Sequence, residues 1–253
     1  FVGYVSDRLR EHWQLLLPIS FIAAAASMTL AGLSQPYWLM VFFIAMSGVA
    51  AAFWHPPAIS MLSTRFPERR GMAIAFHGSG SGAGESLAPL FVGLMLAYWL
   101  MDDWRLYVVL SIIPAAILTL IMYWMLKGAG PAPAPEHTPP PRLSDVFTML
   151  RYPAYRFLAY MNFTRSVAHF GVLSFLPIYL ARDLGMDSAG VGFNVALLTL
   201  LGVFAGPLFG HFSDRMGRRL PMVVGLIVIA ICMTIIGIVG SGPIMLIALG
   251  IMG

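Results

Sequence analysis

The sequence predicts an all-α membrane protein, and three observations support this prediction. Hydrophobic residues make up 59% of the 253 residues. Charged residues make up only 10%, whereas a soluble domain carries about 25%. Apolar runs of about 20 residues recur along the chain, and this is the length that a helix needs to cross a bilayer. The composition therefore excludes an ordinary soluble domain.

Seven complete apolar runs are bounded by charged residues or by Gly and Pro, and the start of an eighth follows them. The predicted spans are residues 13–32, 38–62, 72–100, 106–126, 157–180, 191–212 and 220–239, with the eighth beginning at Ile244. Proline occurs inside several runs, which membrane helices tolerate because neighbouring groups can satisfy the freed backbone.

The basic residues predict the orientation of these spans. Of the 15 Lys and Arg residues, twelve lie on every second connection between the spans. The remaining connections hold only Arg105 and Arg182, and Arg165 lies inside a span. The positive-inside rule places these basic connections in the cytoplasm. Because topology explains the positive net charge, the charge gives no reason to expect nucleic-acid binding. The twelve are Arg8 and Arg10, then Arg65, Arg69 and Arg70, then Lys127, Arg142, Arg151 and Arg156, then Arg215, Arg218 and Arg219.

Residues 128–153 differ from every other connection because they are rich in proline and polar residues. This composition is typical of a semi-rigid, solvated linker. We therefore expect residues 1–127 and 154–253 to belong to different halves, with a short surface helix near residues 144–150.

Several classes of function lack a sequence signal. The single cysteine, Cys232, excludes a disulfide framework and a thiolate metal cluster. No phosphate-binding loop motif occurs, so we expect no ATP-driven step from this chain. The dispersed His residues and Glu85 offer neither a metal-ligand spacing nor a nucleophile with its base. We expect no enzyme activity, no metal and no cofactor.

A short motif occurs twice. Residues 3–8 read Gly-Tyr-Val-Ser-Asp-Arg, and residues 210–215 read Gly-His-Phe-Ser-Asp-Arg. Six predicted spans separate the copies, and the proline-rich linker follows the fourth of those spans. This spacing predicts a protein of twelve helices in two six-helix halves, of which the chain holds about eight spans. Since the chain begins at Phe1 without an initiator Met, we expect a fragment that lacks two helices at each end.

The repeated motif resembles the loop signature of the major facilitator superfamily, G-x-x-x-D-[RK]-x-G-[RK]-[RK]. The second copy matches every specified position, and the first departs after Arg8, with Arg10 in place of glycine. The resemblance covers essentially the whole chain and implies a latch that favours one state of alternating access. The alternative is a basic turn that only sets topology. The predicted latch residues are Gly3, Asp7, Arg8, Gly210, Asp214, Arg215, Gly217, Arg218 and Arg219.

Other motifs are similar to the fosmidomycin-resistance branch of that superfamily. They are Phe53-Trp54-His55-Pro56 and the glycine-rich stretch that runs from Gly78 to Pro89. Gly84, Pro89 and Gly93 also match part of the antiporter motif, in which Ala88 and Val92 replace two glycines. Ile44 stands where many drug/proton antiporters carry an arginine, so the motifs alone do not transfer a coupling mechanism.

Ionisable residues inside membrane spans are costly and are candidates for function. His77, Ser81 and Glu85 recur every four residues, which places them on one face of a helix. Gly80, Gly84 and Ala88 form an adjacent stripe that we expect to pack closely against another helix. We propose Glu85 as the proton-coupling carboxylate, with His77 and His55 as further candidates. The alternatives are a structural pair of Glu85 with Arg165 or His77, and ordinary interhelical hydrogen bonds for the two histidines.

Asn162, Arg165 and His169 share one face of the fifth predicted span, and Asn194 lies on the sixth. The guanidinium of Arg165 suits a carboxylate, phosphate or phosphonate. These four residues are the candidates for substrate binding. Pairing of Arg165 with Glu85 remains the alternative for that residue.

These observations together predict a secondary active transporter with a site between its halves. We expect proton-coupled export of small drug-like or anionic compounds. The alternative is proton-coupled uptake or exchange of a carboxylate or phosphorylated metabolite. A channel would not need the latch repeats. The expected partners are a small-molecule substrate, protons and the lipid bilayer, for a monomer in a bacterial-type inner membrane.

Overall fold

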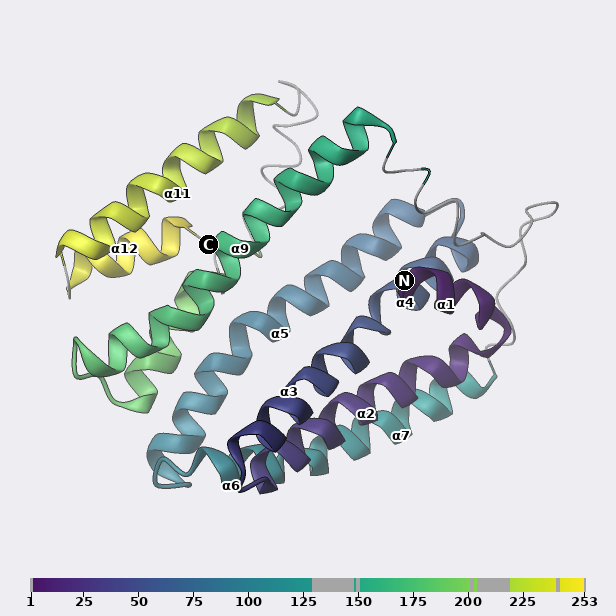
Figure 1. Cartoon of the computed structure of the whole chain (residues 1–253), viewed down its shortest axis with the longest axis horizontal. Coiled ribbons are helices and arrows are strands. Elements are labelled where there is room, and N and C mark those ends of the chain that lie inside the picture. Colours follow the sequence, from purple (N-terminus) through teal and green to yellow (C-terminus); the bar gives the residue numbers. More distant parts are fainter. Residues whose placement is uncertain are drawn as a thin grey trace. The chain divides into compact units, whose positions relative to one another are not determined.

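The computed structural model describes residues 2–128, 148, 151–200, 203, 219–239 and 242–252, apart from a few side chains within helices. Every regular element in these ranges is helical, so the predicted all-α class is confirmed (Figure 1). The elements are α1 (Val2–Arg8), η1 (Arg10–His12), α2 (Trp13–Leu33), α3 (Tyr37–Ala52), α4 (His55–Arg65), α5 (Arg70–Tyr98), α6 (Trp104–Leu110), α7 (Ile112–Lys127), α9 (Pro153–Arg182), α11 (Arg219–Val239) and α12 (Pro243–Met252). A further apolar helix covers Ser188–Leu200.

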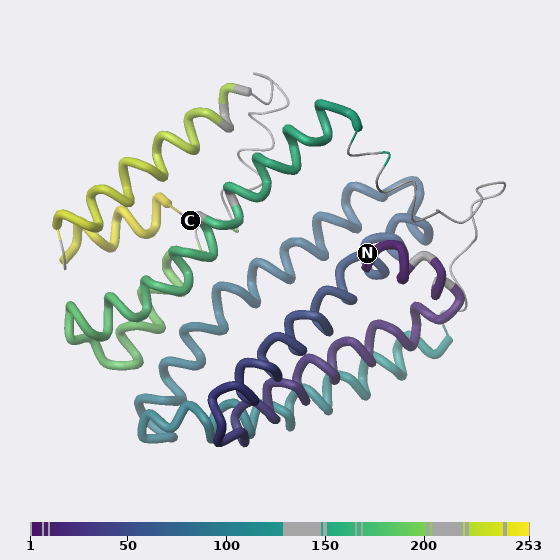
Figure 2. The backbone as a smooth tube through the Cα atoms, in the orientation of Figure 1, coloured from purple at the N-terminus to yellow at the C-terminus, as the bar shows by residue number. Residues whose placement is uncertain are grey.

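Four predicted spans are single helices, namely α2, α5, α9 and α11, and Figure 2 shows α5 as one continuous tube. The eighth begins at Pro243, one residue before the predicted start. Of the sixth span, Ser188–Leu200 is the described part. The predicted linker and its surface helix lie almost entirely outside the described residues.

Two predicted spans are each divided into two helices. The span at residues 38–62 breaks between α3 and α4, at Phe53 and Trp54. The break has a local cause, because Pro56 and Pro57 lack the N–H groups that would continue the helical hydrogen bonds. The span at residues 106–126 divides at Ser111, three residues before Pro114.

Three helical segments of the described chain are long and apolar enough to cross a membrane: Trp13–Leu33, Tyr37–Arg65 and Trp104–Lys127. Helix α5 is also long, at 29 residues. Gly and Ser make up much of its first half and lower its hydropathy.

The residues group into two compact units. The first comprises Phe1–Ala75 and Asp103–Phe163, and the second comprises Phe76–Asp102 and Thr164–Gly253. These units do not follow the linker at residues 128–153, and the division into two six-helix halves stays a prediction.

In the first unit, α2 contacts α3, α4, α6 and α7. Its buried side chains include Trp13 and Leu17, which are each 2% exposed. By contrast, α3 buries no residue, although its composition is strongly apolar. An apolar surface of this kind suits contact with lipid.

In the second unit, a hydrophobic core joins α9, the helix Ser188–Leu200, α11 and α12. Leu180 and Leu249 are completely buried at its centre. The core residues are Leu176, Leu180, Val195, Leu198, Cys232, Ile236, Met245, Ala248 and Leu249.

Candidate functional site

The predicted polar stripe lies on one continuous helix, α5, in the second unit. Ser81 and Glu85 are exposed, and His77 is partly buried. The next residue, Ser86, is buried, and its hydroxyl donates to the carbonyl of Gly82 at 2.8 Å. Neighbouring residues of α5 therefore lie on different faces of the helix: Glu85 is on the exposed polar face, and Ser86 is on a buried face.

The backbone at Glu85 differs from that of an ordinary helix because Pro89 follows four residues later and cannot donate to its carbonyl. Thr199, on the helix Ser188–Leu200, places its hydroxyl oxygen 3.4 Å from the carbonyl oxygen of Glu85. A side chain of a neighbouring helix thus reaches the group that Pro89 frees.

The backbones of the two helices lie against each other at Gly93 and Gly192. A Cβ atom at Gly93 would lie 2.9 Å from the Cα of Gly192 and would also meet the carbonyl oxygen of Ser188. Conversely, a Cβ atom at Gly192 would meet the carbonyl oxygen of Pro89. Only glycine at both positions permits this backbone contact.

The described residues do not show the close helix packing expected at Gly80 and Gly84. A Cβ atom at either position would meet no described atom within 4 Å, and Ala88 is exposed. The contact occurs at Gly93 instead, two turns further along α5. A stripe of small residues indicates that close packing is allowed but does not identify which glycine is in contact.

A hydrogen bond also joins the ends of these two helices. The hydroxyl of Ser188 donates to the carboxylate of Asp102 in the turn after α5. Met101 and Asp102 both have positive φ, at 48° and 61°. Aspartate tolerates this left-handed conformation better than most residues do.

The substrate-binding candidates lie in different environments. Asn162 and His169 are exposed on α9. The Arg165 side chain lies outside the described part of the structure, so its pairing with Glu85 stays a prediction. Asn194 is only 5% exposed and donates to the carbonyl of Gly190 at 2.8 Å. Among the described residues, its side-chain oxygen has no hydrogen-bond partner.

His55 is exposed at the first residue of α4, directly after the break that precedes this helix. The preceding residue, Trp54, contacts Phe21 of α2, with 6.2 Å between the ring centroids. An aromatic contact with α2 therefore lies beside the break between α3 and α4.

The first copy of the repeated motif forms α1. Trp13 is buried and donates its indole N–H to the carbonyl of Ser6 at 2.8 Å. Arg8 is exposed and lies 5.0 Å above the ring of Tyr4. A Cβ atom at Gly3 would meet no atom of the described residues within 4 Å.

The side chain of Asp7 is not described, and Gly210, Asp214, Arg215, Gly217 and Arg218 of the second copy lie outside the described residues. Arg219 is the first residue of α11.

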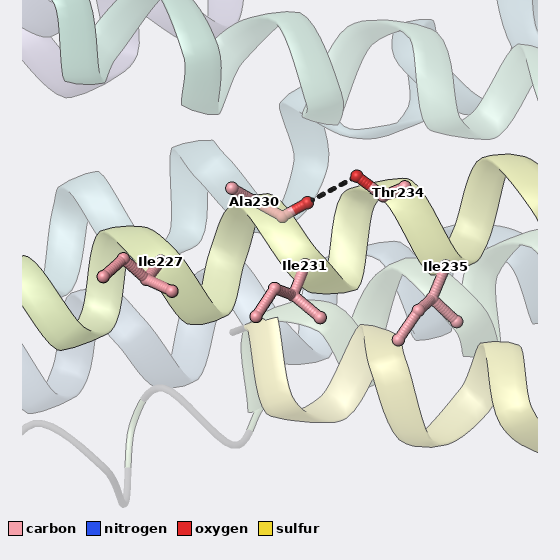
Figure 3. Close-up of a pocket in the computed structure, with 5 residues that line it drawn as sticks. All are labelled: Ile227, Ala230, Ile231, Thr234 and Ile235. Carbon is pink, nitrogen blue, oxygen red and sulfur yellow. Dashed lines mark hydrogen bonds between the residues drawn. The ribbon is translucent and has the colours of Figure 1, made fainter.

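A groove on α11 does not supply a polar site. Its lining comes from a single helix face that includes Ile227, Ile231 and Ile235 (Figure 3). The hydroxyl of Thr234 donates to the carbonyl of Ala230, on the same helix, at 2.9 Å. The described residues also contain no group of three or more His, Cys, Asp or Glu side chains that could hold a metal ion.

Comparison with known proteins places this geometry in a family. The chain is 22% identical to the fosmidomycin resistance protein of Escherichia coli over 86% of its own length and 53% of that protein. It is 23% identical to the multidrug resistance protein MdtG of Klebsiella pneumoniae, over 90% of the chain and 55% of that protein. It is 27% identical to a probable 4-methylmuconolactone transporter of Cupriavidus pinatubonensis, over 92% and 54%. The chain thus spans about half the length of these relatives.

The family model of the Major Facilitator Superfamily matches residues 1–253, which is the whole chain. The apolar helices, with their exposed apolar surfaces, agree with this assignment. The chain is therefore an integral membrane protein that belongs to the Major Facilitator Superfamily.

Proposed function

We propose that the complete protein is a secondary active transporter that works by alternating access and couples proton movement to the export of small drug-like or anionic compounds. One observation carries the proposal: Glu85 is an exposed carboxylate on α5, a helix of membrane length, and shares a face with His77 and Ser81. An ionisable group at membrane depth is expensive unless it faces protein or water, which favours a working role.

In this proposal Glu85 binds and releases the transported proton, and His77 and His55 assist it. Arg165 binds an anionic part of the substrate, with Asn162, His169 and Asn194 as hydrogen-bonding partners. The copies of the motif that begin at Gly3 and Gly210 act as the latch between the two conformations. The division into halves at residues 128–153 and a monomeric state belong to the same proposal.

Two relatives favour export because their names specify resistance to fosmidomycin and to multiple drugs. The distribution of Lys and Arg favours cytoplasmic basic connections. The bacterial relatives favour a bacterial plasma membrane as the location.

The test uses the complete protein in vesicles with an imposed pH gradient. A thermal stabilisation screen that includes fosmidomycin first identifies a compound that binds, and its transport is then measured with and without the gradient. We expect Glu85→Gln to bind the compound but to lose gradient-driven transport. The matched control is Glu68→Gln, which neutralises an exposed carboxylate in the connection before α5. Wild-type gradient dependence in Glu85→Gln would contradict the coupling role.

Uptake or exchange of a carboxylate or phosphorylated metabolite is the second candidate, and the cation at Arg165 inside a predicted span favours it. Counterflow separates the two candidates. Vesicles of known orientation are loaded with unlabelled compound, and entry of labelled compound is followed under each direction of the pH gradient. Accumulation on the side opposite to that expected for a proton-driven exporter would favour uptake.

A further inference from the structure

Pro89 changes the hydrogen bonding of one particular carbonyl. In a regular helix the carbonyl of Glu85 would accept the N–H of the residue four positions later, and that residue is Pro89. Proline has no N–H, so this bond cannot form. In a membrane, such freed carbonyls take donors from neighbouring helices, from Ser or Thr side chains or from water.

Thr199 is placed to supply the donor. Its hydroxyl oxygen lies 3.4 Å from the carbonyl oxygen of Glu85, 3.4 Å from that of Val195 and 3.2 Å from that of Ala196. All three distances exceed the usual length of an O–H···O bond, which is about 2.5 to 3.0 Å. The hydroxyl has one proton to donate, so the three carbonyls compete for it. The carbonyls of Val195 and Ala196 belong to a regular helix and have backbone donors. The carbonyl of Glu85 lacks the usual donor four residues later, so the hydroxyl can take the place of that donor.

Packing around this contact keeps the two helices together. Gly93 and Gly192 bring the backbones into contact one turn beyond Pro89. On the other side of Glu85, a Cβ atom at Gly82 would lie 3.2 Å from the side chain of Val203. The Glu85 turn is therefore flanked on both sides by positions where α5 lies close to the facing segment.

The helix Ser188–Leu200 carries no Asp, Glu, His, Lys or Arg. It has no charge with which to act on the Glu85 carboxylate. The helix Ser188–Leu200 can act on Glu85 through the hydrogen bond to the Glu85 backbone and through the adjacent packing.

We propose that Thr199 is a positioning residue that ties the Glu85 turn of α5 to the helix Ser188–Leu200, so that a shift of this helix moves the carboxylate. Its relevance to transport rests on the proposed coupling role of Glu85. The contact itself does not depend on that role, and the two can be tested separately.

The experiment measures the reaction of Glu85 with dicyclohexylcarbodiimide, a reagent that labels protonated carboxyl groups in apolar surroundings. The complete protein is treated in lipid vesicles, and the labelled fraction of the peptide that carries Glu85 is measured by mass spectrometry at successive times. We expect Thr199→Val to lower the labelling rate about threefold, the size expected for one interhelical hydrogen bond in a membrane. The reason is that an unsatisfied carbonyl draws water to this turn, and the reagent reacts less in wet surroundings than in apolar ones.

Two further variants separate positioning from general packing. Thr199→Ser keeps the hydroxyl and should restore the labelling rate. In Pro89→Ala, the new N–H of residue 89 can satisfy the carbonyl, so adding Thr199→Val to this variant should change the rate little. An unchanged rate in Thr199→Val would overturn the proposal, and so would an equal loss in the Pro89→Ala background.

The labelling experiment tests the positioning role of Thr199, and the transport experiment tests the coupling role of Glu85. If Glu85→Gln keeps gradient-driven transport while Thr199→Val changes labelling, the coupling role fails and the positioning role stands. If Glu85→Gln uncouples transport while Thr199→Val leaves labelling unchanged, the positioning role fails alone. Thr199→Val has nearly the same shape as the native residue, so it should fold, and its thermal unfolding in detergent checks this.

Discussion

Gly93 and Gly192 are in backbone contact, since a Cβ atom on Gly192 would lie only 3.0 Å from the Cα of Gly93. The two residues are far apart in the chain and lie on different helices, α5 and Ser188–Leu200. No side chain separates the two helices at this point, so neither position has room for a methyl group.

Gly93→Ala should therefore destabilise the protein by about 1 to 3 kcal/mol, because the added methyl group forces backbone atoms apart. Gly192→Ala should have a similar effect. Thermal unfolding of the complete protein in detergent measures both. The matched control is Gly84→Ala on the same helix, where a Cβ atom would meet no described atom within 4 Å. A loss as large in Gly84→Ala as in Gly93→Ala would contradict this explanation.

Arg105 holds the end of one helix in the first unit. Its guanidinium donates to the carbonyls of Gly32 and Ser34, at 2.8 Å and 2.7 Å, where α2 ends. Cations at a helix C-terminus are favourable because the last carbonyls lack helical donors. This contact explains why a cation persists on a connection that the positive-inside rule leaves poor in Lys and Arg.

Arg105→Ala should cost about 1.5 to 3 kcal/mol of stability, the range for hydrogen bonds made by a charged group. The stability of Arg105→Lys should lie between that of the native protein and that of Arg105→Ala, because lysine keeps the charge but lacks the planar guanidinium group. Thermal unfolding again gives the measurement. Arg182→Ala is the control, since this exposed arginine lies on the other basic-poor connection; it should cost less than about 1 kcal/mol. Equal losses at the two positions would show that charge alone matters.

The helices could be predicted from the sequence because apolar length and proline positions are local signals. The spans that became α2, α5, α9 and α11 needed only their composition and their flanking residues. The break between α3 and α4 has a local signal in the sequence, the adjacent prolines Pro56 and Pro57. The division at Ser111 was missed, because one proline inside a hydrophobic run does not reveal where hydrogen bonding is interrupted.

The contacts between helices could be predicted much less well. His77, Ser81 and Glu85 were correctly placed on one helix face by their spacing. No sequence pattern indicates that Thr199 meets the Glu85 carbonyl or that Gly93 meets Gly192, because these pairs are distant in the chain. Pro89, four residues after Glu85, was the one available signal of a freed carbonyl.

The indole of Trp13 stabilises α1, the helix that holds the first copy of the repeated motif. It is 2% exposed, and its N–H donates to the carbonyl of Ser6 at 2.8 Å. Trp13→Phe should cost about 1 kcal/mol for the hydrogen bond, with a further loss for the smaller ring. Thermal unfolding of the complete protein measures this cost. Trp38→Phe is the control, because Trp38 is 79% exposed and should tolerate the change.

Substitutions of Arg165 test whether this residue forms the proposed anion site. Arg165→Ala should weaken the binding of an anionic compound found in the stabilisation screen by about ten- to a hundredfold, because a charge-assisted bidentate contact contributes about 1.5 to 3 kcal/mol. Arg165→Lys should recover part of this affinity, since it restores the charge without the fork. Isothermal titration of the complete protein gives the dissociation constants, with Arg182→Ala as a control for net charge. If Arg165→Ala binds this anionic compound as the native protein does, Arg165 does not contact the anion, and its charge is available for the alternative pairing with Glu85.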